Sequence, residues 1–293
     1  MYLKDFNYLR PKTIKEACEM LQNYKDSALM AGGTDLLVEM KNGLRYHENI
    51  ISLADIKELA EITEDEDHII IGAAVTHSTI VKSAILKQHY IALPEASSNV
   101  GTEQVRNIAT VGGNICTGAS CCDTGPVLLA SASTIELTSA KGSREIPIAD
   151  FFIFHRKTAI KAGEIVTKIK VPKLKQGTGI CIEKFGLRDA ASISVASSVA
   201  LITIENDVCV DAKIVIGAVA PTPFISKNAS RYIIGQKVSA LINDSGIMEK
   251  AGEMAASDSQ PLTDIRGSAQ YRKHLVKVLV KRTIKNATIK AVN

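Results

Sequence analysis

Tryptophan is absent from this 293-residue chain, and aromatic residues make up only 4% of it. A protein that stacks nucleic-acid bases needs a platform of aromatic side chains, so no such platform is expected here. Acidic and basic residues nearly balance, with 31 Asp and Glu against 35 Lys and Arg, and no basic block is interleaved with aromatics. The composition therefore argues against a nucleic-acid partner.

Long apolar runs are also missing. The longest clearly apolar uncharged run, residues 190–204, is shorter than the ~20 residues that a membrane-spanning helix needs, and its serines favour a strand. Residues 1–10 carry charges and aromatics in place of the apolar segment of a signal peptide. Six cysteines are scattered without the spacing of a disulfide framework, which is typical of a reducing compartment. We therefore expect a cytoplasmic protein with no membrane contact.

Recognised metal and catalytic motifs are lacking as well. Cys116, Cys121 and Cys122 stand close together, but an iron–sulfur cluster needs four thiolates in a recognised spacing. The remaining cysteines fall in predicted core elements, at Cys18, Cys181 and Cys209. The six histidines show no HxH or HExxH pairing, so we predict no bound metal. The absence of GxSxG, GxGxxG and Walker motifs excludes the usual serine-hydrolase, Rossmann and P-loop sites.

The order of predicted elements indicates an α+β protein with two domains, at residues 1–175 and 176–293. A basic, polar and glycine-bearing segment at residues 173–177 marks the boundary between them. The first domain divides further into parts of about 1–55 and 56–175, because a small α/β pattern is complete by residue 55.

Hydrophobic periodicity and turn signals predict the individual elements. In the first domain a capping box opens a helix at Thr13, and a short strand leads to Ala31. The further elements expected there are a helix from 36 to 40, strands at 50–53, 68–73 and 164–171, and a hairpin over 134–147. The second domain is expected to pair long antiparallel strands and then to turn helical, with strands at 178–186, 194–205 and 208–218 and helices over 250–256 and 271–284.

Two glycine pairs provide the main functional signal. One is Gly32-Gly33, which follows an apolar run, and the other is Gly112-Gly113 in the segment 110–123. The second segment is small and polar, so it is predicted as a turn with no core of its own. Glycine has no Cβ, and two such turns can bring backbone N–H groups close to one long anionic ligand. Two ordinary glycine turns would explain the same pattern equally well.

Two further residues, Asp123 and Lys184, each allow a structural and a functional interpretation. Asp123 can cap the helix that follows it, or accept hydrogen bonds from ligand hydroxyls. Lys184 can be an exposed strand lysine or a ligand-binding one. Arg188 and Asp189 follow a glycine in a predicted loop and read as a solvated ion pair.

Taken together, the motifs resemble those of the FAD-binding subunit of molybdenum hydroxylases, most closely the subunit of bacterial three-subunit xanthine dehydrogenases. The residues that carry this resemblance span almost the whole chain: Ala31 to Leu36, Gln104 to Ile115, Asp123, Glu164 to Val166, Lys184-Phe185 and Ala218 to Pro223. The two glycine motifs are specific at this order and separation. Arg188 to Ala190 and Ala220 to Pro223 look like the xanthine dehydrogenase branch and are less specific.

The resemblance implies an FAD site between the two parts of a p-cresol methylhydroxylase-type domain. A small antiparallel sheet with helices, of the carbon monoxide dehydrogenase flavoprotein C-terminal type, is expected to follow. The implied FAD contacts are Leu29 and Met30 beside the pyrophosphate, Ala31, Gly32, Gly33, Thr34, Asp35 and Leu36 around it, Thr110, Gly113, Asn114, Cys116 and Thr117 on the pyrophosphate and ribityl parts, Cys122 and Asp123 on hydroxyls, Ile165 and Val166 at the adenine end or ring edge, and Val100, Gly101 and Lys184 at the flavin.

The implied function is the last electron-transfer step of such an enzyme. Electrons would pass from [2Fe–2S] centres on a partner subunit through FAD to NAD+, and a molybdopterin-binding subunit would hydroxylate the substrate. In much of the family a proline-containing segment stands in place of Ser120-Cys121-Cys122, which puts the side-chain contacts there in question. The alternatives are a related subunit serving an aldehyde, nicotinate or carbon monoxide enzyme, and a non-catalytic assembly module.

Overall fold

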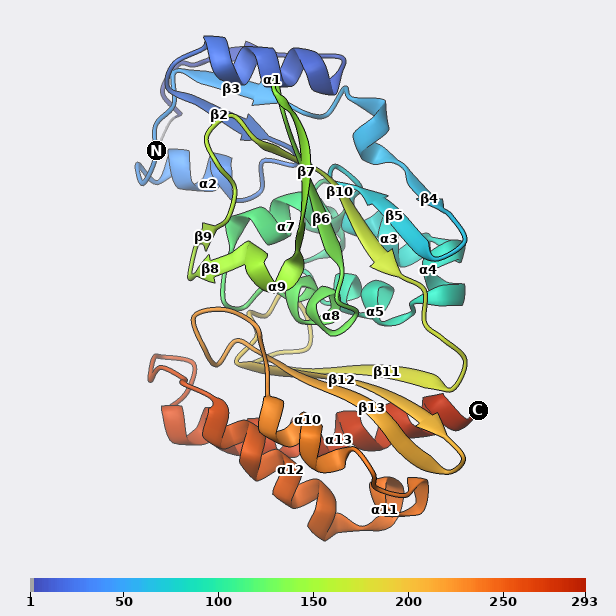
Figure 1. Cartoon of the computed structure of the whole chain (residues 1–293). Coiled ribbons are helices and arrows are strands. Elements are labelled where there is room, and N and C mark those ends of the chain that lie inside the picture. Colours follow the sequence, from blue (N-terminus) through green and yellow to red (C-terminus); the bar gives the residue numbers. More distant parts are fainter. Residues whose placement is uncertain (1–2) are drawn as a thin grey trace.

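Three units follow one another along the chain and are stacked in space in the same order (Figure 1). The computed structural model describes residues 3–293. In the first unit, a parallel three-stranded sheet of order β1-β3-β2 packs against helix α1. Its elements are β1 (Asn7–Leu9), α1 (Ile14–Asn23), β2 (Ser27–Met30), α2 (Leu36–Lys41), β3 (Asn49–Ser52) and the 3-10 helix η1 (Lys57–Ala60).

Local signals in the sequence explain where the helices of this unit begin and end. The Thr13 hydroxyl accepts a hydrogen bond from the backbone N–H of Glu16 at 3.1 Å, which confirms the predicted start of α1. Helix α2 ends before Gly43, whose φ of 73° lies in the left-handed region that glycine adopts without strain. The predicted strand and helix on either side of the first glycine pair are therefore confirmed.

The second unit is an antiparallel sheet of order β4-β5-β10-β6-β7, with short helices covering one of its faces (Figure 1). Its sheet strands are β4 (Ile62–Glu64), β5 (His68–Gly72), β6 (Thr134–Ser139), β7 (Gly142–Pro147) and β10 (Ile165–Pro172). Its other elements are α3 (His77–Lys82), α4 (Ala84–His89), α5 (Ala92–Ser98), α6 (Glu103–Arg106), α7 (Val111–Thr117), α8 (Thr124–Ala130), α9 (Ile148–Phe151), β8 (Phe152–Phe154) and β9 (Lys157–Thr158).

The segment predicted as a coreless glycine turn forms a helix instead. Helix α7 begins after Thr110, whose hydroxyl caps it, and the glycine pair lies in its first turn. Val111 and Ile115 on this helix are completely buried in the main core, so the segment does have a core face. The prediction was wrong because two apolar residues, four positions apart, suffice when a sheet lies directly beneath them.

The third unit is a four-stranded antiparallel sheet, β11-β12-β13-β14, packed on four helices (Figure 1). Its elements are β11 (Thr178–Phe185), β12 (Ala196–Glu205), β13 (Val208–Gly217), β14 (Phe224–Ile225), α10 (Lys227–Ile233), α11 (Val238–Asn243), α12 (Ser245–Asp258) and α13 (Ala269–Val292). The tight turn joining β12 to β13 has positive φ at both Asn206 and Asp207, as a two-residue hairpin requires.

The third sheet is buried on both faces and thereby joins two cores. Val199 and Leu201 of β12 pack into the core of the second unit, whereas Ala200 and Ile202 pack against the helices below. Side chains of a strand alternate between faces, so an uninterrupted apolar run is what a strand between two cores needs. This explains why residues 199–202 form a continuous apolar stretch and why every residue from 196 to 202 is buried.

Gly179 provides a test of how closely this sheet and its longest helix pack. A Cβ at this position would lie 2.0 Å from the Ala287 carbonyl oxygen of α13. We expect Gly179→Ala to lower the free energy of unfolding by roughly 1–3 kcal/mol, the usual cost of overpacking. Gly246→Ala is the matched control, because there the nearest atom to a new Cβ is an oxygen of the Asp244 carboxylate, at the much longer distance of 3.2 Å. Equal urea-unfolding free energies for the two variants would contradict this packing.

Candidate functional site

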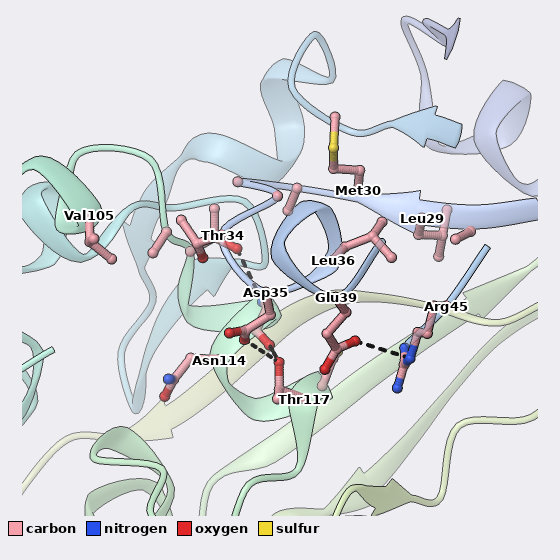
Figure 2. A pocket seen from close by; sticks show the side chains of 18 of the residues that line it. Leu29, Met30, Thr34, Asp35, Leu36, Glu39, Arg45, Val105, Asn114 and Thr117 are labelled. Atoms are coloured by element: carbon pink, nitrogen blue, oxygen red, sulfur yellow. Dashed lines mark hydrogen bonds and ion pairs between the residues drawn. The ribbon is translucent and has the colours of Figure 1, made fainter. Parts of the chain in front are cut away.

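A cavity of about 510 Å³ lies where the first unit meets helix α7 of the second (Figure 2). Its volume is within the usual range of small-molecule sites. The walls come from the end of β2 and the start of α2, from helix α7, and from loops of both units. The residues that form them are Ala28 to Leu36, Glu39, Arg45, His47, His77, Val100, Val105, Ala109, Thr110, Gly113, Asn114, Cys116, Thr117 and Arg156.

The two glycine segments meet on one side of this cavity, although 80 residues separate Gly32 from Gly112. A Cβ on Gly32 would lie only 1.9 Å from the carbonyl oxygen of Ile108, so only glycine permits this approach. The Thr117 hydroxyl donates to the Asp35 carboxylate at 2.8 Å, which ties α7 to the start of α2 (Figure 2). The expected convergence of the two segments is therefore present.

The first glycine segment offers unpaired backbone donors. Within the described residues 3–293, none of the N–H groups of residues 31–35 donates a hydrogen bond to the protein. Gly33 has a φ of 70°, in the left-handed region, and Asp35 is right-handed, a combination that can turn N–H groups of a loop toward one side. Such a row of donors is the backbone arrangement that binds phosphate and other anions.

The second glycine segment has no comparable supply of free N–H groups. The first-turn amides of Val111 and Gly112 donate to carbonyls of the second unit, and that of Gly113 donates to the Thr110 hydroxyl at 3.1 Å. On this side the cavity is therefore bordered by the side chains of Thr110, Asn114 and Thr117, in place of the amide cradle expected from the sequence.

The two glycines of this pair have different surroundings. A Cβ on Gly112 would lie 2.5 Å from the Ala73 carbonyl oxygen, inside the fold. A Cβ on Gly113 would meet only the Thr110 hydroxyl at 3.1 Å, and Gly113 borders the cavity. Gly112 is thus required for packing, whereas Gly113 leaves space for what occupies the cavity.

One end of the cavity is charged, and sequence reasoning missed it. Glu39 is buried and binds two guanidinium groups, those of Arg45 at 3.0 Å and Arg156 at 2.5 Å. Figure 2 shows Glu39 and Arg45 on the opposite side of the pocket from Val105 and Asn114. Glu39 lies one helical turn after Asp35, so the sequence could have placed both carboxylates on the same side of α2. Its ion pair with Arg156 could not be predicted, because the two residues are far apart in the sequence.

The other end is mostly apolar and contains a buried histidine, which was also missed. His77 borders the cavity together with Val100, Val105 and Ala109. Burial and the nearby Arg106 guanidinium lower the pKa of His77 to about 4, so the ring is neutral at pH 7. Its Nδ1 lies 3.3 Å from the Ser97 hydroxyl, and its Nε2 has no partner among the described residues.

Asp123 and Lys184 form a buried pair beyond the cavity wall. The Lys184 ammonium donates to the Asp123 carboxylate at 2.8 Å and to the Asn99 carbonyl at 3.1 Å, while Ser194 donates to Asp123 at 2.6 Å. Burial raises the pKa of Asp123, and Lys184 and Ser194 oppose this shift. The structural interpretations of both residues were wrong: Asp123 makes no side-chain cap, and the Lys184 side chain is only 10% exposed.

The loop after Lys184 also differs from its prediction. Arg188 donates to the Ala191 carbonyl, and no ion pair joins it to Asp189 in the described chain. The guanidinium thereby holds the loop in a closed turn, instead of pairing with its neighbour.

The clustered cysteines are thiols in a hydrogen-bonded core. Burial raises the pKa values of Cys116 and Cys122 to about 12, so both are protonated at pH 7. Cys122 Sγ donates to the Asn114 side-chain oxygen at 2.9 Å, which orients an amide that borders the cavity. Within residues 3–293, no group of three or more His, Cys, Asp or Glu is arranged to hold a metal ion.

The predicted contact residues divide into two sets. Those that border the cavity are Leu29, Met30, Ala31, Gly32, Gly33, Thr34, Asp35, Leu36, Val100, Thr110, Gly113, Asn114, Cys116 and Thr117. Those outside its wall are Gly101, Cys122, Asp123, Ile165, Val166 and Lys184. Ile165 and Val166 are buried in the cores of the first and second units. The roles of both sets toward a ligand remain predictions.

Two family models match the chain. Residues 4–174 match the FAD binding domain in molybdopterin dehydrogenase, and residues 184–287 match the carbon monoxide dehydrogenase flavoprotein C-terminal domain. Both matches agree with the two-part α+β fold described above. Among residues 3–293, no helix is long and apolar enough to cross a membrane.

Relatives and solved structures match over nearly the full length. The chain is 30% identical to the carbon monoxide dehydrogenase medium chain of Afipia carboxidovorans, over 98% of each protein. It is 29% identical to the xanthine dehydrogenase FAD-binding subunit of Escherichia coli O157:H7, over 97% of each. A crystal structure of the Cu,Mo-CO dehydrogenase in its cyanide-inactivated form superimposes with a TM-score of 0.93 at 29% identity, covering 99% of this chain and 100% of the other.

The buried histidine predicts a specific dependence of stability on pH. The folded pKa of about 4 is below the ordinary value of 6.5, so the unfolded state binds more protons between these values. Stability is therefore full above pH 6.5 and is lost as the pH falls toward 4. We expect roughly 2 kcal/mol to be lost between pH 7 and pH 5 through this group.

Urea unfolding of wild type and His77→Leu at both pH values measures this contribution. The variant lacks the titrating ring, so its loss of unfolding free energy over the interval should be smaller by that amount. Parallel pH dependences in the two proteins would show that His77 is protonated equally in both states.

Proposed function

Because the chain belongs to the family of FAD-binding domains of molybdopterin dehydrogenases, we propose that it passes electrons from [2Fe–2S] centres on a partner subunit through FAD to NAD+. The observation that carries this proposal is the cavity bordered by both glycine segments, with free amides of residues 31–35 in its wall. A dinucleotide has the same order of parts: a ring system, a pyrophosphate and a second nucleoside.

The residues present fit FAD. The row of N–H groups from residue 31 to 35 would bind the pyrophosphate, because backbone donors of this kind match phosphate oxygens. Asn114 and Thr117 present an amide and a hydroxyl on the facing helix, suited to the hydroxyls of the sugar-like linker. Gly113 leaves room for the ligand to approach this helix.

When bound, FAD supplies both single-electron and hydride transfer, which lets an iron–sulfur centre and a nicotinamide communicate. The chain itself binds and orients the cofactor. Asp123 and Lys184, held by Ser194 and Asn99, form a buried pair outside the cavity wall. Because Lys184 binds the carbonyl of Asn99, the pair would hold the backbone before Val100, which borders the cavity, in place beside the flavin.

A heteromeric enzyme is the expected setting of this chain. Its matched relatives are named as a medium chain and as an FAD-binding subunit, which supports one molybdopterin-binding and one [2Fe–2S] partner subunit. We place the complex in the cytoplasm, and the six free cysteines support a reducing compartment.

The substrate of the complex is proposed to be a purine such as xanthine. Support comes from Arg188 to Ala190 and from Ala220 to Pro223, which resemble the xanthine dehydrogenase branch. This chain is 30% identical to the carbon monoxide relative and 29% identical to the xanthine relative, so overall identity does not distinguish the two substrates. Activity measurements on the assembled complex with xanthine, nicotinate, an aldehyde and carbon monoxide therefore test the substrate directly.

The glycine pair provides a test of the cofactor site. We expect Gly113→Val to lose FAD binding while keeping the wild-type circular dichroism spectrum, because its side chain would fill the cavity wall. Gly112→Val should lose the folded state, since its Cβ meets the Ala73 backbone. Wild-type FAD affinity in the Gly113 variant, measured by flavin fluorescence titration, would show that the ligand lies elsewhere.

The electron-transfer role is tested with the isolated chain carrying FAD. We expect it to oxidise NADH with an artificial electron acceptor and to show no hydroxylation of xanthine. Addition of the molybdenum and iron–sulfur subunits should produce substrate-dependent reduction of NAD+. A reconstituted complex that reduces oxygen but never NAD+ would contradict the dehydrogenase role and leave FAD binding intact.

A further inference from the structure

Three charged side chains, those of Glu39, Arg45 and Arg156, border one end of the cavity. Glu39 is buried and binds both guanidinium groups, whereas the side chains of Arg45 and Arg156 are 51% and 42% exposed. Within residues 3–293, Glu39 is the only side-chain partner of either guanidinium. Each guanidinium has five N–H donors, so accessible donors remain at this end of the cavity.

The backbone holds both arginines in place. The Leu44 N–H donates to the Glu39 carbonyl at 2.9 Å, which folds the loop carrying Arg45 back onto helix α2. The Arg156 N–H donates to the Gly118 carbonyl at 2.7 Å, at the end of helix α7. Arg156 has a φ of 59°, a left-handed conformation that is strained for a residue with a Cβ. Such strain is concentrated at ligand-binding and active sites.

Stability alone does not account for the cluster. Burying a carboxylate costs solvation energy, and the ion pairs that it makes return little or no net stability. A buried ion pair is retained where it fixes the position of charged groups. Here Glu39 holds two half-exposed guanidinium groups at the cavity wall, which reduces the conformational freedom that they would lose on binding a ligand.

The order of parts in FAD assigns this end to adenosine. With the pyrophosphate at the N–H groups of residues 31–35, the isoalloxazine and the adenosine lie on opposite sides of it. The apolar wall at Val100 and Val105 suits the isoalloxazine, one end of which is a dimethylbenzene ring. Figure 2 shows Glu39 and Arg45 on the opposite side of the pocket from Val105. The charged end is therefore the one left for adenosine.

The cluster also has the chemistry that adenosine requires. Guanidinium groups donate hydrogen bonds, and the adenine ring nitrogens and ribose oxygens accept them. The Glu39 carboxylate accepts hydrogen bonds, and the ribose hydroxyls donate them. Leu29 adds an apolar surface to the wall, and Figure 2 shows it on the same side of the pocket as Arg45. Ile165 and Val166, which the sequence suggested for the adenine, lie outside the wall.

We propose that Glu39, Arg45 and Arg156 bind the adenosine part of FAD and thereby make the site select FAD over FMN. This inference rests on the proposed function and assigns one end of the same cavity. FMN contains the isoalloxazine, the ribityl chain and one phosphate, but no adenosine. A contact with adenosine therefore strengthens the binding of FAD and leaves that of FMN unchanged.

The experiment measures the dissociation constants of FAD and FMN for the flavin-free, full-length chain, by fluorescence titration. The variants are Arg45→Gln, Arg156→Gln and Glu39→Gln. Arg231→Gln is the matched control, because Arg231 is an exposed arginine on helix α10 of the third unit. Near neutral pH both ligands carry about two negative charges, so a general change in cavity charge largely cancels in the ratio of the two dissociation constants.

We expect each of the three cavity variants to raise the FAD dissociation constant roughly tenfold, which corresponds to the loss of one hydrogen bond. The FMN constant should change by less than about a third of that factor, so the preference for FAD falls in all three. Arg231→Gln should leave both constants at their wild-type values. Inorganic pyrophosphate, used as a competitor without adenosine, should bind Glu39→Gln no more weakly than wild type.

The opposite charges of the cluster separate recognition from simple electrostatics. Removing an arginine makes the cavity more negative, whereas Glu39→Gln makes it more positive. If the cluster acted through charge alone, Glu39→Gln would tighten FAD binding and the arginine variants would weaken it, with an unchanged preference over FMN. That result would overturn the inference.

Two further outcomes would also overturn it: wild-type FAD affinity in Arg45→Gln and Arg156→Gln, or an equal loss of affinity for FAD and FMN. The first leaves the cluster without a ligand, and the second moves its action to the phosphate or the flavin. Both arginines are half-exposed, so their variants keep the test valid where Glu39→Gln lowers the stability of the fold. The proposed function fails only when the wild-type chain binds no FAD, a result distinct from all of these.

Discussion

The close approach of two backbones at Gly32 and Ile108 is the contact on which the cavity depends. Because no Cβ intervenes, the loop after β2 lies against the loop before α7, and the Asp35–Thr117 hydrogen bond secures the same junction. At the charged end of the cavity, the ion pair between Glu39 and Arg156 connects the same two units. The first and second units are thereby held at a fixed spacing, and the free amides of the first face the polar side chains of the second.

Much of the fold could be predicted from the sequence, because its determinants are local. Thr13 caps a helix that begins where expected, and Asn206-Asp207 closes the hairpin between the two predicted long strands. Helix α7 was missed because its stability comes from burial of Val111 and Ile115 against a sheet, which no local pattern reveals. The segment was judged by its glycines, whereas tertiary packing decided its structure.

In the candidate site, too, the features with local determinants could be predicted from the sequence, and those that depend on tertiary packing could not. The two glycine segments could be recognised in the sequence, because each combines the backbone freedom of a glycine pair with characteristic residues on either side. The contacts made by charged side chains could not: Glu39 and Arg156, or Asp123 and Lys184, are distant in sequence and become neighbours only through the packing of separate elements. His77 was missed for another reason, because a single histidine after a helix cap carries no signal until its buried, unpaired nitrogen is seen.

The charges on the cavity wall indicate how it selects its ligand. Two carboxylates, Asp35 and Glu39, and two guanidiniums, those of Arg45 and Arg156, border it, so their formal charges cancel. In the FAD complex that we propose, the pyrophosphate would therefore gain little from net charge and much from the N–H groups of residues 31–35, which the folded loop already holds in place. Backbone dipoles held by a folded loop lose no side-chain entropy on binding, in contrast to flexible lysines. Selectivity then follows from the spacing between the amides and the two ends of the cavity, which the Gly32–Ile108 contact sets.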